Sequence, residues 1–309
     1  MKKWLLVFVL ALILLMLTGC SGEKATKADF FTYIVNVDNT VTITGYTGNE
    51  AAVVVPSKIK GKKVVEIGEG AFKKNLIIQT VSLPTGLVTI GQSAFSDCEK
   101  LASVSLPDSI SVIGKSAFAR TSISSISIPN GVTEIGDSAF YDCNKLTSIN
   151  LPDSINSIGK YAFAYTNISS ISLENTGVTV LRENSFFSCK NLQQVTFPKG
   201  IKSIESDAFR GCESLKSINL PEGLEKIDIG AFEHCDKLRG FTIPRSVTYL
   251  GFDFKVTTYN GKPMMLYYTP FASYTSIREV KVYRDSYAHK MVQTWEWKEG
   301  SLYDYEIID

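Results

Sequence analysis

Three short sequences rich in glycine and serine are the first places in this chain where residue types suggest chemistry. Gly114-Lys115-Ser116 matches the end of a phosphate-binding loop, in which a lysine and backbone N–H groups hold phosphate oxygens. Such a loop needs a glycine five positions earlier, and that position is Ser109. Gly136-Asp137-Ser138 and Gly91-Gln92-Ser93 match the start of a nucleophile elbow, but phenylalanine replaces its second glycine in both. None of the three predicts a catalytic site.

Cysteines are the next group with chemical potential. Thiols in an extracytoplasmic domain can form disulfides, and clustered thiols can bind zinc. Here the number beyond residue 20 is odd, each lies three residues after a phenylalanine, and threonine takes the equivalent place twice. We therefore interpret them as buried thiols that pack as small apolar side chains, rather than as a bridge or metal site. These cysteines are Cys98, Cys143, Cys189, Cys212 and Cys235.

Histidines and carboxylates complete the search for catalytic or metal-binding residues. The two histidines, His234 and His289, lie far apart, and neither H-E-x-x-H nor a paired C-x-x-C occurs. Many aspartates fall at turn positions, the usual place for solvated carboxylates. A carboxylate pair for glycoside cleavage, assembled from distant parts of the chain, stays open. The sequence predicts a protein that is not an enzyme and has no cofactor or metal.

A phenylalanine that recurs with an almost constant step sets the architecture. The successive steps are 23, 23, 22, 23, 23, 23 and 23 residues, and a small residue precedes each phenylalanine. A fixed period of 20–50 residues is typical of a solenoid of stacked units. The chemical sequences above repeat with this period, so we assign them to the scaffold. The ladder comprises Phe72, Phe95, Phe118, Phe140, Phe163, Phe186, Phe209 and Phe232.

One repeat shows why the units must stack. Ile149 and Leu151 flank a polar residue, an alternation that places both on one face of a strand. Pro152 ends the strand because it has no N–H to donate, and Ile155 and Ile158 return to the core. About five buried apolar side chains contribute roughly 2 kcal/mol each. Ordering the backbone costs about 1–2 kcal/mol per residue, so one repeat is unstable alone.

These residues carry a family resemblance. The pattern L-x-x-I-x-L-P-x-x-I-x-x-I-G-x-x-A-F-x-x-C resembles the leucine-rich repeats of the BspA-like type, and the segment from Phe31 to Phe72 resembles the start of such arrays. The resemblance implies a β-rich repeat solenoid of about 23-residue units with little regular helix. It also implies a surface protein for adhesion or protein recognition, without enzymatic activity. Clear copies are Leu83–Cys98, Leu106–Phe118, Ile128–Cys143, Leu151–Phe163, Phe197–Cys212 and Leu220–Cys235.

Three departures from the pattern are informative. The links Ala119–Ile123 and Ala164–Ile168 are one residue short and carry threonine in place of cysteine, so we expect an alternative turn in both. Glu174 replaces the strand-ending proline and an extra residue follows, so we expect a local irregularity. Charged residues replace the glycine of the pattern in three copies, so that position does not demand positive φ. They are Arg182, Glu205 and Asp228.

The N-terminus predicts the location. Two lysines precede 14 uninterrupted apolar residues, too few for a spanning helix but typical of a signal peptide. The sequence Leu17-Thr18-Gly19-Cys20 resembles the lipobox of bacterial lipoproteins, which implies cleavage before Cys20 and a lipid on its sulfur. The alternative is a secretory signal with an accidental cysteine. The resemblance implies a lipid anchor in the bacterial cell membrane, with the protein on its extracytoplasmic side.

Composition agrees with a folded body and argues against nucleic acid as a partner. Apolar residues make up 44% and charged residues 20% of the chain. Without Lys2 and Lys3, 30 basic residues stand against 31 acidic ones, so no strong field attracts a polyanion. We divide the chain into a signal peptide (1–19), a lipidated tether (20–29), the solenoid with its opening strands (30–250), an irregular last repeat with an inserted hairpin (251–285) and a C-terminal α/β cap (286–309).

Two surfaces offer binding positions. The outward strand positions are rich in hydroxyl groups, from Thr80 and Ser82 to Gly240 and Thr242, and carry none of the Tyr, Trp or Arg side chains that anchor interfaces. The step from Phe232 to Phe271 is 39 residues, 16 more than the period, and Asn260-Gly261 predicts a hairpin in this insertion. Its aromatic residues either seal the last coil or bind a partner.

We expect the partner to be an extracellular protein, with a glycan bound through the hairpin as the alternative. The candidate residues for partner binding are Phe254, Tyr259, Met264, Tyr267 and Tyr268. Beyond the insertion, Ser286 is placed to cap a short helix that runs to about Trp295, and the alternation from Tyr303 to Ile308 predicts a final strand.

Overall fold

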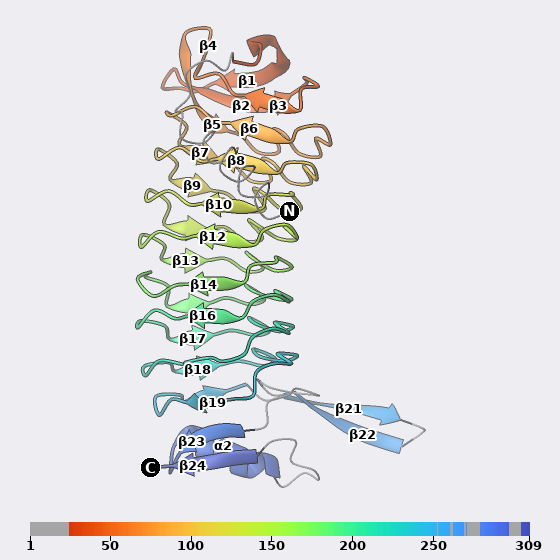
Figure 1. Cartoon of the computed structure of the whole chain (residues 1–309), viewed down its shortest axis with the longest axis vertical. Helices are drawn as coiled ribbons and strands as arrows, with labels where there is room; N and C mark the ends of the chain where they lie inside the picture. The colour runs from red at the N-terminus through yellow and green to blue at the C-terminus, as the bar shows by residue number, and fades with distance from the viewer. Residues whose placement is uncertain (1–24, 252, 260–261, 269, 271–278, 297–303) are drawn as a thin grey trace, which may run out of the picture.

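The computed structural model describes residues 25–251, 253–259, 262–268, 270, 279–296 and 304–309. Successive coils stack along the long axis of the molecule, with the N-terminal strands at one end and the C-terminal cap at the other (Figure 1). Each coil has one side with a three-residue strand, one with a two-residue strand, and a side of tight turns that carries the ladder phenylalanine. The predicted β-rich solenoid of about 23-residue units is confirmed.

The two-residue strands form the continuous hydrogen-bonded side. They join into one 12-stranded sheet that runs through the described coils in register, so that Ile135 pairs with Ile158 and Ile204 with Ile227. Only β1 with β2 and β4 with β5 are antiparallel in it. Its members are β1 (Phe31–Val35), β2 (Val41–Tyr46), β4 (Lys58–Ile59), β5 (Lys62–Ile67), β7 (Thr89–Ile90), β9 (Val112–Ile113), β11 (Glu134–Ile135), β13 (Ser157–Ile158), β15 (Val180–Leu181), β17 (Ser203–Ile204), β18 (Lys226–Ile227) and β20 (Tyr249–Leu250).

The three-residue strands form short sheets with breaks between them. Parallel pairing joins β3, β6 and β8, then β10 with β12, and β14 with β16. The steps from β8 to β10 and from β12 to β14 are 22 residues, and these are the steps where pairing is lost. The two short links thus interrupt this side and leave the 12-stranded sheet intact. The strands are β3 (Ala52–Val54), β6 (Thr80–Ser82), β8 (Ser103–Ser105), β10 (Ser125–Ser127), β12 (Ser148–Asn150), β14 (Ser170–Ser172) and β16 (Gln194–Thr196).

One expected strand is absent from this side. The sequence places Ser217 and Asn219 on a strand, but residues 216–220 have no strand pairing. The N–H of Lys216 lies 3.5 Å from the carbonyl oxygen of Gln193, a stretched contact that does not start a ladder. The irregularity expected at Glu174 is a turn closed by a hydrogen bond from Thr176 N–H to Leu173 O.

The phenylalanine ladder fills the third side of the coils. All eight rings are at most 2% exposed, and from Phe72 to Phe232 neighbouring centroids lie 4.9–5.7 Å apart with nearly parallel planes. The backbone is also tied from coil to coil here, because the ladder N–H donates to the next coil. Phe163, for example, donates to Ser185 O at 2.9 Å. The recurring phenylalanine is therefore a structural stack, as the period predicts.

Two positions in each coil adopt left-handed backbone, two residues before and two residues after the ladder phenylalanine. They bracket the turns that reverse the chain on this side. The glycine of the repeat pattern is at neither, and its φ is not positive, as expected. In the coils that carry this glycine, the adjacent coil approaches closely. A Cβ on Gly114 would lie 2.7 Å from the backbone nitrogen of Gln92.

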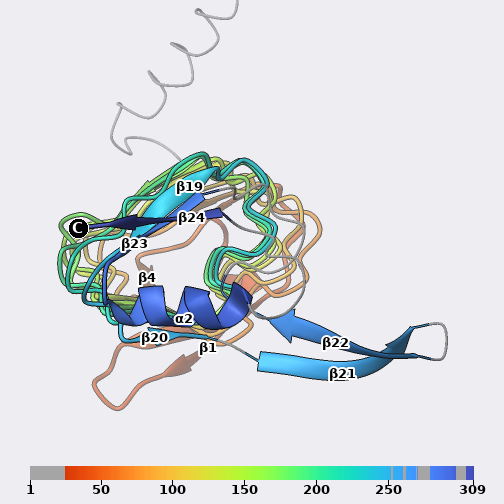
Figure 2. The same cartoon turned by 90° about the horizontal axis from the view of Figure 1, so that it is seen from below.

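The two ends of the solenoid are closed differently. At the N-terminal end the 3₁₀ turn η1 (Ala28–Phe30) leads into β1, which pairs with β2. At the other end β19 (Gly240–Ile243) pairs with β23 (Glu279–Tyr283), and β23 pairs with β24 (Asp304–Ile308). Helix α2 (Tyr287–Glu296) lies across the end of the coils (Figure 2). Ser286 Oγ accepts a hydrogen bond from His289 N–H at 3.1 Å, which confirms the predicted cap.

The insertion in the last repeat is a hairpin, as Asn260-Gly261 predicts. Strand β21 (Asp253–Tyr259) pairs antiparallel with β22 (Lys262–Tyr268). Phe232 N–H donates to Pro270 O at 2.8 Å, where earlier ladder residues donate to the alanine or serine that precedes the next phenylalanine. Phe241 pairs with Val280, 39 residues later, so the 16-residue insertion is confirmed. Phe271 itself lies outside the described residues.

Candidate functional site

The sequences that resemble catalytic loops are turns of the scaffold. The N–H groups of Gly114 and Ser116, which a phosphate would need, donate to Ile90 O and Asp137 O at 2.8 Å. Ser138 N–H is likewise donated to Lys160 O. Because these N–H groups already donate to carbonyl oxygens of neighbouring coils, neither the turn at Gly114 nor the turn at Ser138 can offer them to a phosphate or an oxyanion.

The five cysteines are buried free thiols, as expected. Each Sγ donates to the carbonyl oxygen of the ladder phenylalanine in the preceding coil, at 3.0–3.3 Å. Burial raises the pKa of the Cys98 and Cys189 thiols to about 12 and that of Cys143 to about 11. Thr121 and Thr166 donate a hydrogen bond to the carbonyl oxygen of the ladder phenylalanine in their own coil, at 2.9 and 2.8 Å. Thiol and hydroxyl both find a buried carbonyl acceptor at this position, the thiol in the preceding coil and the hydroxyl in its own coil.

Metal and membrane sites gain no support in the described parts of the chain. No group of three or more His, Cys, Asp or Glu side chains with metal-binding geometry occurs within the described ranges. Among the same residues, none of the helices has the length and apolar character to cross a bilayer. The candidate lipidation residue Cys20 lies outside the described residues.

The outward strand positions form an exposed hydroxyl-rich surface. Ser125, Ser127, Ser148 and Asn150 are exposed around the half-buried or buried isoleucines of β10 and β12. The strand breaks divide this surface into short segments, and no aromatic or arginine side chain stands at the predicted outward positions. It lacks the anchors of a selective binding site.

The hairpin β21–β22 stands away from the solenoid (Figure 2). Its backbone extends sideways beyond the coils, whereas β23, β24 and α2 lie at the end of the column (Figure 1). The five candidate residues are all on its two strands: Phe254 pairs with Tyr267, which precedes Tyr268, whereas Met264 pairs with Thr257 and Tyr259 with Lys262. Their side chains lie outside the described parts, so partner binding there remains a prediction.

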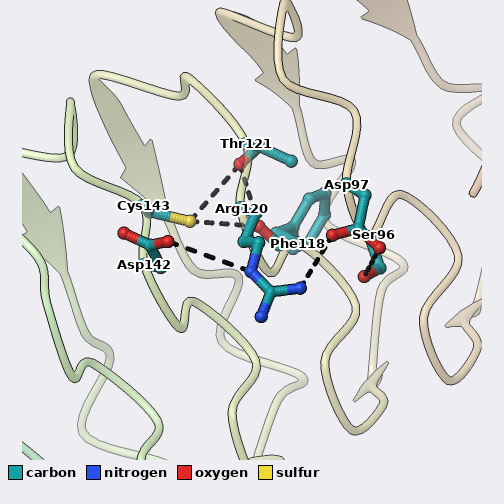
Figure 3. Close-up of polar contacts among 7 residues, drawn as sticks. All are labelled: Ser96, Asp97, Phe118, Arg120, Thr121, Asp142 and Cys143. Carbon is teal, nitrogen blue, oxygen red and sulfur yellow. Dashed lines mark hydrogen bonds and ion pairs between the residues drawn. The ribbon is translucent and has the colours of Figure 1, made fainter. Parts of the chain in front are cut away.

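The turn side of the solenoid carries an ion-pair network that the sequence did not reveal. Asp97, Arg120 and Asp142 occupy the left-handed position after the ladder phenylalanine in three consecutive coils. Stacking aligns them, and Arg120 lies between the two carboxylates (Figure 3). Its Nη1 is 3.0 Å from Asp97 Oδ1 and its Nε is 3.9 Å from Asp142 Oδ2. Burial alone would raise the pKa of Asp97, but hydrogen bonds from Arg120 and Ser96 lower it.

Beside this network is a cluster of aromatic side chains that we call the aromatic patch. The Arg120 guanidinium lies over the Tyr141 ring, 5.6 Å from its centroid. Tyr141 contacts Tyr165 edge-on at 5.5 Å and Tyr161 at 6.4 Å, and Tyr165 contacts Phe187 at 5.3 Å. Tyr161 is 36% and Tyr165 41% exposed, so the cluster faces solvent. It comprises Tyr141, Tyr161, Tyr165 and Phe187 and spans three consecutive coils.

Sequence reasoning missed this patch because it considered the outward positions of strands and the hairpin insertion, but not the bends of the coils. The patch residues lie at the bends around the ladder phenylalanine, one or two residues from it, where no strand alternation identifies an outward side chain. A usable signal was present in the repeat alignment. Tyr161 and Tyr165 fill positions that hold small or polar residues in the other coils, such as Ser138 and Ser188.

Comparison with known proteins agrees with the geometry. Residues 65–192 and 179–254 match the model of the BspA type leucine rich repeat region. The T. pallidum leucine-rich repeat protein TpLRR is 35% identical, with a TM-score of 0.59 over 62% of this chain and 91% of that one. A leucine-rich cell surface protein of Faecalibacterium prausnitzii is 23% identical, with a TM-score of 0.40 over 74% of this chain and 90% of that one. No curated protein matches the chain.

The column of in-register coils and its buried phenylalanine stack define the class, a leucine-rich repeat solenoid. The family match covers more than half of the residues, and the T. pallidum protein shares 35% identity over nearly its whole length. The chain belongs to the BspA-type leucine-rich repeat family, so its body is a repeat scaffold.

Proposed function

We propose that this protein is a bacterial surface lipoprotein, anchored to the cell membrane through a lipid on Cys20, whose non-catalytic solenoid binds other proteins in adhesion. The apolar N-terminal run followed by Leu17-Thr18-Gly19-Cys20 supports export and anchoring. Membership of a repeat-scaffold family supports a role in presenting a binding surface to other proteins. The loops that resemble catalytic sequences have their backbone donors committed to neighbouring coils, which supports a non-catalytic body.

The observation that carries protein binding is the aromatic patch with Arg120 beside it. Tyrosine and arginine are enriched among the residues that dominate interface energies. Tyrosine provides a large contact area at a low entropic cost, since it has only two side-chain torsions. The patch lies on a rigid stack of coils, so its rings are held in place before a partner arrives.

A second candidate function is carbohydrate binding by the hairpin. Its support is the position of β21 and β22, which extend away from the coils instead of covering the last one (Figure 2). The insertion contains several aromatic residues in paired strands, and aromatic rings can stack on sugar faces. This proposal and the protein-binding proposal concern different surfaces of the molecule.

Binding assays on the intact protein separate the two functions. The full chain in detergent micelles is incubated with a panel of purified host matrix proteins and with a glycan array. Binding to a matrix protein supports adhesion, and binding to glycans that is lost in Tyr267→Ser/Tyr268→Ser supports the hairpin as a lectin site. Turnover in a hydrolase screen that a single carboxylate substitution abolishes would overturn both.

A further inference from the structure

Two tyrosines of the aromatic patch adopt a backbone conformation that the fold needs at their positions but that is unfavourable for aromatic residues. Tyr161 has φ 56° and Tyr165 has φ 61°. The left-handed region is unfavourable for bulky residues, and asparagine, aspartate and glycine adopt it more readily. Sixteen such positions flank the eight ladder residues, and only these two carry tyrosine, tryptophan or phenylalanine. Both occur in the same coil, so the chain bears this strain twice at one place on its surface. Strain of this kind concentrates at functional sites.

Acidic side chains surround the patch on both flanks. On one side Arg120 stands between Asp97 and Asp142. On the other, Lys160 pairs with Glu183 at 2.9 Å, and Arg210 pairs with Asp207 at 3.3 Å and with Glu233 at 3.1 Å.

Further carboxylates stand close to the same second flank. The pKa of Lys160 is raised first by its hydrogen bond to Glu183 and also by the charges of Glu205 and Asp137. With Lys73, whose charge also acts on Asp97, these groups make seven carboxylates against four cations, a net charge of −3 in a chain whose total is +1.

The acidic field reaches Tyr161 itself. The pKa of Tyr161 is raised by desolvation and then by the negative charges of Glu183 and Asp207. The pKa of Asp207 is raised by burial and by the neighbouring charges of Glu183 and Asp228, despite its pairing with Arg210. Several carboxylates therefore lie near the exposed ring of Tyr161. A cation bound at this ring is also attracted by these carboxylates.

We infer that the aromatic patch is a docking site for a cationic segment of a partner protein, whose lysine or arginine side chains lie on the faces of Tyr161 and Tyr165 and pair with Glu183 and Asp207. The ring face attracts a cation through its quadrupole. Negative charge around the patch attracts a basic partner and repels an acidic one. This inference rests on the proposed protein-binding function and assigns it a site and a class of partner.

The repeats themselves provide substitutions that the fold accepts. Tyr161→Ser and Tyr165→Ser introduce the residues found at the equivalent positions 138 and 188, both of which have positive φ. Glu183→Gln and Asp207→Asn introduce the residues at the equivalent positions 92 and 184. Tyr249→Ser removes an exposed tyrosine from β20 on the sheet side, where the equivalent position 203 is serine, and is the matched control.

The experiment titrates the full chain in detergent micelles with a fluorescent 12-residue peptide of alternating arginine and glycine. Peptides with glutamate or serine in place of arginine are the controls. We expect Tyr161→Ser/Tyr165→Ser to weaken binding about tenfold and Tyr161→Phe/Tyr165→Phe to retain it within about twofold, since the ring supplies the attraction. Glu183→Gln/Asp207→Asn should weaken it about threefold and reduce its salt dependence. Tyr249→Ser should bind as the wild type does.

Several results would overturn the inference. These are unchanged binding in the tyrosine-to-serine variant, an equal loss in Tyr249→Ser, or equal binding of the serine peptide. Glycan binding that is lost in Tyr161→Ser/Tyr165→Ser would identify the patch as a sugar site instead. If the wild-type protein binds a matrix protein but not the arginine peptide, the proposed function stands and the cationic partner is wrong.

Discussion

Replacement of Phe186 by alanine tests whether the phenylalanine stack holds the coils together. Phe186 is fully buried, and its ring lies 5.4 Å from Phe163 and 5.3 Å from Phe209 with interplanar angles of 21° and 6°. Buried Phe→Ala changes cost about 3–5 kcal/mol, because apolar burial is reduced and a cavity remains. Since the Phe186 ring stacks on a neighbour at each face, we expect about 4–5 kcal/mol here. For a body of this size that lowers the melting temperature by about 8–20 °C.

The next residue is a matched control. Phe187 belongs to the same coil but is half-buried on the turn side, and its ring contacts Tyr165 at 5.3 Å. Phe187→Ala deletes the same atoms, yet about 1 kcal/mol is expected because much of the ring is already in water.

Urea unfolding followed by circular dichroism measures both free energies of unfolding. Amide hydrogen exchange shows whether the loss is confined to the coils next to residue 186, since each repeat contacts only its neighbours. Equal losses in the two variants, or less than about 1 kcal/mol for Phe186→Ala, would refute the stacking argument.

Three further predictions concern other parts of the chain. Gly114→Ala should destabilise the solenoid by about 1–3 kcal/mol, because its Cβ would meet the backbone of the adjacent coil, whereas Gly200→Ala, with open space around it, should be nearly neutral in thermal unfolding. The raised pKa of buried thiols such as Cys189 stabilises the fold below the unfolded value of 9.0, so the free energy of unfolding should fall as pH rises from 9 towards 12; a flat profile in pH-dependent urea titrations would contradict this. Cys20→Ala should abolish incorporation of labelled fatty acid and release the protein from the membrane fraction, and labelling that persists would exclude Cys20 as the lipidation site.

Much of the fold follows from the sequence because it depends on a repeated pattern. The 23-residue period identifies the buried ladder, and the alternation around Ile149 identifies a strand of each coil. The continuous sheet escapes such reasoning, because two-residue strands such as Ser157–Ile158 are too short to show an alternation. The absent strand at Ser217 is also beyond sequence reasoning. Its residues fit the repeat pattern, but the hydrogen bond from Lys216 to the preceding coil is stretched.

The candidate sites divide in the same way. Cys20 and the hairpin insertion are visible in sequence as departures from the period, and Asn260-Gly261 predicts the hairpin down to its two-residue connection. The aromatic patch is not visible there, because Tyr141, Tyr165 and Phe187 are 22 to 46 residues apart and meet only when coils stack. The two exposed rings, Tyr161 and Tyr165, lie at positions with left-handed backbone.

The sequence by itself determined that this chain is a stack of similar coils with a buried phenylalanine and a thiol or hydroxyl on most rungs. A constant period fixes which residues share an environment, and their apolar character fixes that environment as the core. Only the tertiary structure decided what those coils present to the outside. Coil-to-coil spacing is about 5 Å, so residues one period apart become neighbours, and it is this contact that brings Arg120, the tyrosines and their carboxylates onto one surface.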